Sequence, residues 1–340
     1  IGGTTAETRN IISGNGTNEV ETNEAGDVIG PLHLGHGILI TDPGTTNNEI
    51  IGNYIGTDVT GLASISNAFS GIVIRSGASG NFIGGPGEGE GNVITGNGDP
   101  SNGCPENCGN GAANQYGNGI YIIGDDVGGE SSTDNIIQGN LVGRAADGST
   151  LRNATAGIRL DGTDGNLIGG TEEGAGNIIT GHSATFFTSG GIALRSTFRT
   201  RVEGNTSIGN ETGITLGNCV EAVIGSPGAG NVLSANTDGV GISGGRDNVF
   251  HGNFIGTDST GTGAVGNSWS GFYVSGIQEN LQIGGSGSGE GNVFAANRQS
   301  GLIISNIEPI SAEGEPAIFI QGNVFGTTVS GTSALPNGLM

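Results

Sequence analysis

The sequence contains no lysine, and it has one tryptophan, one methionine and three cysteines among its 340 residues. Only 12% of the residues are charged, so the chain is too poor in common helix-forming residues to be a helix-rich protein. No run approaches the roughly 18 apolar residues of a membrane-spanning helix. Glycine does not recur at every third position, which excludes a collagen-like triple helix. These absences leave either a disordered chain or an ordered, β-rich one.

The charge is one-sided, because 32 acidic residues face 10 arginines and the net charge is −22. Such a field repels nucleic acid and anionic membrane surfaces. We therefore predict neither a nucleic-acid partner nor membrane insertion, and we expect an extracellular or cell-surface location, where cations are abundant. We expect no organic cofactor, and Ca²⁺ is the ion that carboxylate ligands favour.

The three cysteines agree with that location. Cys104 and Cys108 lie close together in a stretch rich in glycine and asparagine, where they can close a small disulfide loop. Such a bond fits an oxidising compartment. Cys219 is then left over, and we expect it to be buried as a small apolar residue.

Glycine and proline are abundant, with 72 and 9 residues, which together make 81 of 340. Isoleucine outnumbers leucine more than twofold, and this favours strands over helices. Composition alone does not separate a low-complexity chain from an unusual ordered one. Internal repeats separate them, and they are present along the whole chain.

Short strands of the form G-I-x-I recur throughout. The copies begin at Gly37, Gly71, Gly119, Gly157, Gly191, Gly213, Gly271 and Gly301. Two continuations alternate after them: N-x-I-x-G-N-x-I-G-T-D-x-T-G, as in 48–61, and I-G-G-x-x-x-G-x-G-N-x-I-x-G-N, as in 83–97. Repeated short strands between glycine and asparagine turns predict an all-β solenoid of parallel strands. We expect about nine to ten coils in a two-coil alternating super-repeat, with Ile72 and Ile74 inside and Val73 and Arg75 outside.

Asparagine recurs at fixed places in the coils. Glycine and asparagine tolerate the left-handed backbone of sharp corners, and a buried asparagine can hydrogen-bond its counterpart one coil along. We predict one such column of Asn53, Asn140, Asn205, Asn253 and Asn323, with Asn15, Asn97, Asn236 and Asn297 in the intervening coils. His182 replaces asparagine in one coil.

These elements resemble those of right-handed parallel β-helix repeat proteins, the pectin-lyase-like superfamily. The resemblance covers essentially the whole chain and implies a three-faced, right-handed coil, the usual hand of parallel crossovers. The superfamily includes polysaccharide lyases, hydrolases and epimerases as well as adhesins and phage tailspikes, so it implies a fold and no single activity. We expect one β-helix domain over residues 1–340, with insertions at 16–35 and 98–118, taken from a longer chain because both ends interrupt the repeat.

The outward positions of the G-I-x-I strands suggest a binding face. In four consecutive coils they include Arg75, Tyr121, Arg159 and Arg195. Aromatic rings stack on pyranose faces and arginine pairs with carboxylates, so this set fits a polysaccharide. The alternative is a solvated sheet face with salt bridges such as Arg195 to Asp161.

Aspartates gather just past the same strands. Asp125 and Asp126 belong to one coil, and Asp161 and Asp164 belong to the next. A cluster of this kind can bind Ca²⁺, which takes roughly six to eight oxygen ligands, or it can raise one carboxyl pKa to make a general acid. Aspartate also simply suits turns.

Three functions remain open. The leading hypothesis is a structural or adhesive module that contacts carbohydrate with the help of Ca²⁺. The second is a polysaccharide-active enzyme, a lyase or an inverting glycoside hydrolase, whose catalytic residues would be Asp125, Asp126, Asp161, Arg159 and Arg195. The third is a filament or stalk formed by end-to-end stacking of copies.

Overall fold

The computed structural model describes residues 1–16, 35–98, 117–124, 131–183, 190–309 and 318–338. Within these residues all regular secondary structure is β-strand. No helix in this part of the chain is long and apolar enough to cross a membrane. The predicted insertions at 16–35 and 98–118 lie almost entirely outside the described residues.

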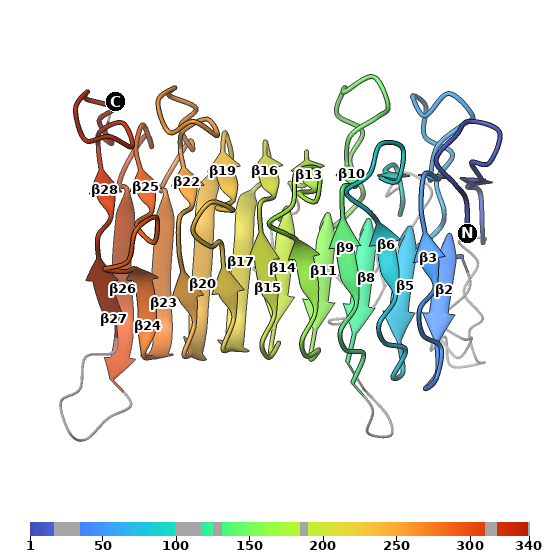
Figure 1. Ribbon diagram of the computed structural model, residues 1–340, viewed down its shortest axis with the longest axis horizontal. Helices are drawn as coiled ribbons and strands as arrows, with labels where there is room; N and C mark the ends of the chain where they lie inside the picture. The colour runs from blue at the N-terminus through green and yellow to red at the C-terminus, as the bar shows by residue number, and fades with distance from the viewer. Residues whose placement is uncertain (17–34, 99–116, 125–130, 184–189, 310–317, 339–340) are drawn as a thin grey trace, which may run out of the picture.

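The strands form three sheets along an elongated coil (Figure 1). The first sheet consists of β2 (Ile38–Thr41), β5 (Ile72–Arg75), β8 (Ile120–Ile123), β11 (Ile158–Asp161), β14 (Ile192–Arg195), β17 (Thr212–Val220), β20 (Asp238–Arg246), β23 (Phe272–Glu279) and β26 (Leu302–Pro309). The second sheet consists of β3 (Glu49–Ile50), β6 (Phe82–Gly84), β9 (Ile136–Gln138), β12 (Leu167–Gly169), β15 (Arg201–Glu203), β18 (Val223–Ile224), β21 (Val249–Phe250), β24 (Leu281–Gly284) and β27 (Ile318–Gln321). The third sheet consists of β1 (Ile11–Ile12), β4 (Tyr54–Ile55), β7 (Val93–Ile94), β10 (Leu141–Val142), β13 (Ile178–Thr180), β16 (Thr206–Ile208), β19 (Val232–Ser234), β22 (Phe254–Ile255), β25 (Val293–Phe294) and β28 (Val324–Phe325).

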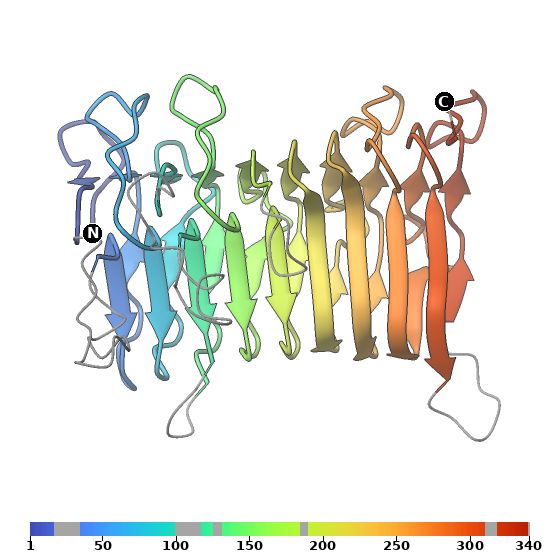
Figure 2. The ribbon, with the colours of Figure 1, turned by 180° about the vertical axis from the view of Figure 1, so that it is seen from behind.

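Each strand pairs in parallel with the corresponding strands of the coils before and after it. The chain is therefore a parallel β-helix, and the predicted fold class is confirmed. Sheets of nine, nine and ten strands agree with the predicted nine to ten coils. Figure 2 shows the first sheet from its outer side, where the strands lengthen from four residues in β14 to nine in β17.

The side chains alternate as predicted. Ile72 and Ile74 are fully buried in the core between the sheets, whereas Val73 between them faces outward. Aliphatic residues fill most of the core, and Phe250 and Phe272 pack edge to face near its C-terminal end, with ring centroids 4.8 Å apart. The repeated isoleucines thus form continuous columns, one residue per coil and sheet.

Two ladders of asparagine flank the strands of the third sheet. The first ladder lies before those strands and consists of Asn10, Asn53, Asn92, Asn140, Asn177, Asn205, Asn231, Asn253, Asn292 and Asn323. The second ladder lies after them and consists of Asn15, Asn67, Asn97, Asn153, His182, Asn210, Asn236, Asn267, Asn297 and Asn337.

The prediction that all these asparagines share one column is therefore wrong. The motif G-N-x-I-x-G-N holds two asparagines five residues apart, as at Asn92 and Asn97, with the short strand β7 between them. One asparagine lies at each end of the strand, so the two must stack in separate ladders. Asn97 belongs to the second ladder with Asn15, Asn236 and Asn297, whereas the first ladder continues through Asn92.

The two-coil alternation is visible in the turns after the third sheet, where β7 and β13 are followed directly by turns at Gly96 and Gly181 and β16 is the exception among the alternate strands that carry a longer loop. Loops closed by an antiparallel bridge follow β4, β10, β22 and β28, whereas the chain turns at Gly209 after β16, with φ 68°. In three of these loops an aspartate accepts a hydrogen bond from the hydroxyl group two residues further on. That bond lowers the pKa of Asp58, Asp147 and Asp258. These aspartates therefore stabilise turns.

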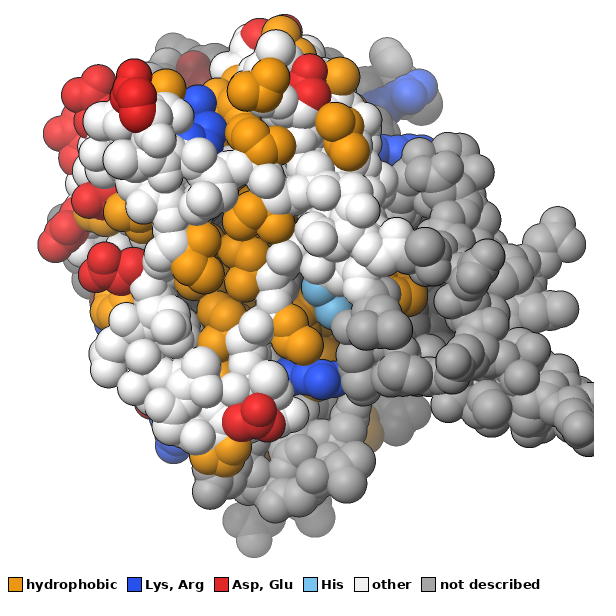
Figure 3. Space-filling model, turned by 90° about the vertical axis from the view of Figure 1, so that its right-hand side faces the viewer, with side chains coloured by type: hydrophobic (Ala, Val, Ile, Leu, Met, Phe, Trp, Pro, Cys, Tyr) orange, Lys and Arg blue, Asp and Glu red, His pale blue; other side chains and the backbone are white. Residues whose placement is uncertain are grey.

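Apolar side chains are exposed at both ends of the described coils. Figure 3 views the end that holds the N-terminus, where apolar side chains gather in the middle of the surface. Ile1 and Ile11 are exposed in the N-terminal coil. In the C-terminal coil Ile304, Ile320 and Phe325 are exposed, although they occupy the inward columns of the three sheets.

Candidate functional site

The outward face of the first sheet brings the predicted binding residues side by side. Tyr121 of β8 is in register with Val73 of β5 and with Arg159 of β11. Ala193 of β14 follows on the other side of Arg159. These outward side chains are nevertheless buried, with Tyr121 only 3% and Arg159 only 1% exposed. Tyr121 and Arg159 are therefore too buried to form an open binding surface for a ligand.

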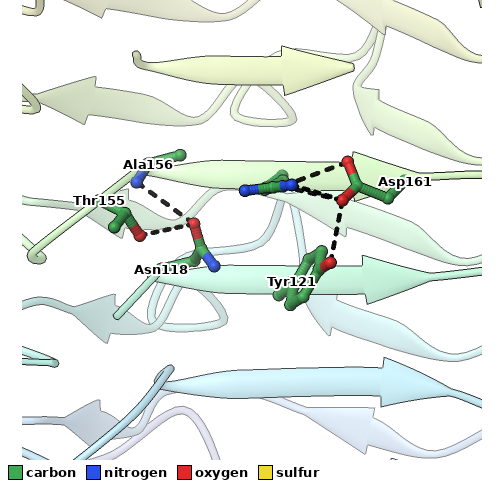
Figure 4. A network of polar contacts seen from close by, with 6 residues as sticks. Asn118, Tyr121, Thr155, Ala156 and Asp161 are labelled. Carbon is green, nitrogen blue, oxygen red and sulfur yellow. Dashed lines mark hydrogen bonds and ion pairs between the residues drawn. The ribbon is translucent and has the colours of Figure 1, made fainter. Parts of the chain in front are cut away.

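Arg159, Asp161 and Tyr121 form one polar network (Figure 4). Nη2 of Arg159 donates to Oδ2 of Asp161 at 2.6 Å, and the Tyr121 hydroxyl donates to the same oxygen at 2.9 Å. The guanidinium carbon also lies 5.3 Å from the centroid of the Tyr121 ring. A buried charge requires a partner, so these contacts stabilise Arg159 on the sheet.

The other two predicted arginines lie at the edge of this face. Arg195 is exposed at the end of β14, in register with Asp161, but Asp161 forms its ion pair with Arg159. Residues two apart on one strand point to the same side, so Arg159 reaches Asp161 without crossing to another strand. The salt bridge from Arg195 to Asp161, which was the example for the alternative of a solvated sheet face, is thus replaced in the described residues by the pair of Arg159 and Asp161. Arg75 is half-buried at the end of β5.

The two described members of the predicted acidic cluster, Asp161 and Asp164, form separate ion pairs. Asp161 is engaged by Arg159, and Asp164 pairs with Arg199 of the next coil. Across the described ranges no three His, Cys, Asp or Glu side chains come close enough to hold a metal ion. Asp125 and Asp126 lie outside the described residues, so Ca²⁺ binding stays a prediction.

Cys219 is buried and free. Burial raises the pKa of its thiol, which suits an unreactive structural cysteine. Cys104 and Cys108 lie outside the described residues, and their disulfide stays a prediction.

His182 takes the place of an asparagine in the second ladder and is fully buried. Its Nε2 lies 3.3 Å from Nδ2 of Asn153, and its Nδ1 lies 3.2 Å from Oδ1 of Asn210. An amide nitrogen only donates and an amide oxygen only accepts, so the ring carries its proton on Nδ1 and accepts at Nε2. Burial lowers the pKa of His182 to about 4.

The C-terminal half of the first sheet is open on its outer side. Thr215 of β17, Gly241 of β20 and Tyr273 of β23 are in register across three neighbouring strands. Tyr273 is half-buried, and Trp269, four residues before it, is 52% exposed. These residues were missed in the sequence, although the strand copy G-F-Y-V at 271–274 already places Tyr273 outward.

No protein-family model and no curated protein sequence matches the chain. Among solved structures, the chain is similar to an alginate lyase from Paenibacillus sp. str. FPU-7, with a TM-score of 0.31 and 13% identity. The match covers 84% of this chain and 95% of the lyase chain. Identity this low transfers neither substrate nor activity.

Proposed function

We propose that this protein is an extracellular, non-catalytic β-helix scaffold that contacts carbohydrate through the outward face of its first sheet, with Ca²⁺ as an accessory ion. The network around Asp161 supports the non-catalytic part most directly. Glycoside hydrolysis needs a carboxyl that can exchange a proton or attack the sugar. Both oxygens of Asp161 accept hydrogen bonds from Arg159, and one also accepts from Tyr121. Asp161 therefore acts as the partner of a buried arginine.

The regular coil supports the scaffold part. Three continuous sheets and two hydrogen-bonded ladders make one long, evenly supported body. Its outer faces carry side chains in rows about 4.8 Å apart from strand to strand. Solenoids use such extended surfaces to bind long ligands, and a polysaccharide is a long ligand with a regular repeat.

A turnover assay separates the scaffold from an enzyme. The protein is incubated with neutral polysaccharides and polyuronates, with and without Ca²⁺, and the products are examined for new reducing ends and unsaturated sugars. We expect binding and no product. Product from any of these glycans would overturn the non-catalytic proposal in favour of a lyase or an inverting hydrolase.

If product forms, variants identify its source. Asp126→Asn and Arg195→Ala change two of the predicted catalytic residues that are not committed to the Arg159 ion pair. Tyr121→Phe serves as the matched control, because it removes one hydrogen bond to Asp161 and no charge. Activity lost in the first two variants and kept in the third would assign catalysis to the predicted acidic corner.

A further inference from the structure

The open half of the first sheet has a depression where an outward side chain is missing. Gly241 lies between Thr215 and Tyr273 on the neighbouring strands. A Cβ on Gly241 would meet only Cγ2 of Thr212 within 4 Å, at 3.8 Å. The same is true of Gly217, the next outward position of β17, where a Cβ would meet only the Leu194 carbonyl oxygen, at 4.0 Å.

Backbone geometry does not require glycine at either place. Gly217 and Gly241 are absent from the residues with positive φ, unlike the many glycines at the corners of the coil. A glycine in a strand interior weakens the strand and often marks a place where a ligand approaches the backbone closely. The empty space above Gly241 is therefore the feature to explain.

The depression has an aromatic wall and a polar rim. Tyr273 stands on one side of Gly241 and Thr215 on the other. The next outward residues along the strands are Ser243 and Ser275, which are in register with each other. Hydroxyl groups thus lie beside the aromatic ring at more than one edge of the depression.

One carboxylate lies where β20 begins. Asp238 is in register with Thr212, and its Oδ1 accepts a hydrogen bond from the Ser270 backbone N at 3.0 Å. Within the described residues its Oδ2 receives no hydrogen bond, so this oxygen can accept one from a ligand hydroxyl. The arginine of the same strand, Arg246, lies at the far end, in register with Glu279.

We propose that this depression is a subsite for an uncharged pyranose unit of a polysaccharide. This proposal rests on the carbohydrate contact proposed above, and it specifies where on the sheet the contact lies and which class of sugar binds there. The ring face of one sugar packs on Tyr273 and its hydroxyls bond to Thr215 and Ser243, while a hydroxyl of the neighbouring unit bonds to Asp238, which lies three residues before Gly241 on the same strand. A polyuronate does not suit the subsite, because the carboxylate of the neighbouring unit would lie beside Asp238, whereas Arg246 lies at the other end of the strand.

Trp269 extends the site and reports on it. It is the single tryptophan of the chain, and its backbone N donates to Thr237 O at 2.8 Å while its O accepts from Gln299 N at 2.9 Å. It lies before the start of β23 and precedes Tyr273 by four residues, so the two residues are at most about 14 Å apart along the chain. A glycan of several sugars can therefore reach both aromatic residues.

The test is a binding titration of the whole 340-residue chain. Calorimetry and the fluorescence of Trp269 both measure the binding. The probes are three neutral polysaccharides (a β-glucan, a xylan and a galactomannan) and two polyuronates (polygalacturonate and alginate). We expect a neutral polysaccharide to bind and the polyuronates not to bind. Tyr273→Ala should weaken binding about tenfold or more, because it removes the stacking surface, and Gly241→Val should do the same by filling the depression.

Matched variants keep these outcomes separate from misfolding. Tyr273→Phe keeps the ring and should keep most of the affinity, and Val59→Ala, in the exposed loop after β4, should change nothing. All variants should melt within a few degrees of the wild type, because Tyr273 and Gly241 lie on the outer face and outside the apolar core.

The possible failures are distinguishable. A neutral glycan that binds equally well to wild type, Tyr273→Ala and Gly241→Val would overturn the subsite and leave the carbohydrate contact standing. Binding of polyuronates alone, abolished by Arg195→Ala, would also overturn the subsite and would locate the contact at the arginines. If none of the five glycans binds, both proposals fail.

Discussion

His182 is the one histidine in the second ladder, whose other described members are asparagines, and its hydrogen bonding depends on pH. The amide side chains on either side of it keep the same donors and acceptors at any pH at which proteins fold. The neutral ring supplies the donor that Asn210 needs and the acceptor that Asn153 needs. A second proton on Nε2 would set one N–H against another and place a positive charge in a fully buried site. Arg152 adds to that cost through its own positive charge.

We therefore predict that His182 makes the protein sensitive to acid and that His182→Asn removes this sensitivity. The pKa of His182 falls from 6.5 to about 4 on folding, so the unfolded chain takes up the proton first. Stability is lost as the pH falls from the higher to the lower of these values, by about 2 kcal/mol at pH 5 and about 3 kcal/mol at pH 4 for this residue.

Urea unfolding of both proteins at pH 7.5, 5 and 4 measures this effect. The carboxyl groups titrate in wild type and variant alike, so the difference between the two proteins isolates His182. Asparagine is the right replacement because it is the residue of the neighbouring rungs. If the two proteins lose stability in parallel as the pH falls, the ladder tolerates the protonated ring and the prediction is wrong.

Among structural elements, the first asparagine ladder stabilises one corner of every coil. Asn177 shows a complete rung: its Oδ1 accepts from the backbone N and the Nδ2 of Asn140, and its Nδ2 donates to Asn205 and to the Ile137 carbonyl. All of these groups are buried, and water cannot replace the lost partners. The ladder thus satisfies backbone groups that a corner between short strands would otherwise leave unpaired.

We predict that Asn177→Ala lowers the free energy of unfolding by about 3 kcal/mol or more, because several buried groups lose their partners at once. Asn10→Ala is the matched control, since Asn10 is an exposed rung at one end of the same ladder and its side chain, among the described residues, bonds to Asn53 alone. It should cost about 1 kcal/mol or less. Urea unfolding of the two variants measures both losses, and equal losses would show that the ladder is not what stabilises the corner.

For the whole molecule, the fold could be predicted from the sequence because it depends on a period. The alternation that buries Ile72 and Ile74 is repeated in every coil, and parallel stacking aligns equal residues. The candidate site depends on how far each outward side chain is exposed to solvent. The alternation of side chains along a strand does not determine this exposure. Tyr121 and Tyr273 occupy equivalent outward positions, yet Tyr121 is 3% exposed and Tyr273 is half-buried. Sequence periodicity therefore predicts whether a side chain points inward or outward, but it does not predict how exposed an outward side chain is.

The charge of the whole molecule was the feature that the fold did not explain. The chain has 32 acidic residues and 10 arginines, and the described residues form three ion pairs. Mutual repulsion of the remaining carboxylates opposes the compact state. Salt should relieve it, because charges at the surface are screened within about 10 Å at 0.1 M ionic strength. A melting temperature that rises with NaCl is therefore expected.

Screening also provides the baseline against which Ca²⁺ must be judged. If Asp125, Asp126, Asp161 and Asp164 contribute to a calcium site, Ca²⁺ binds the native state in particular and stabilises it beyond screening. We expect Ca²⁺ to raise the melting temperature more than Mg²⁺ at the same ionic strength, because Mg²⁺ needs a tighter octahedral site and sheds water reluctantly. Asp126→Asn should remove the excess and keep the response to NaCl. Equal shifts for the two ions would mean that Ca²⁺ only screens repulsion, and the acidic residues would then act through their number instead of through a site.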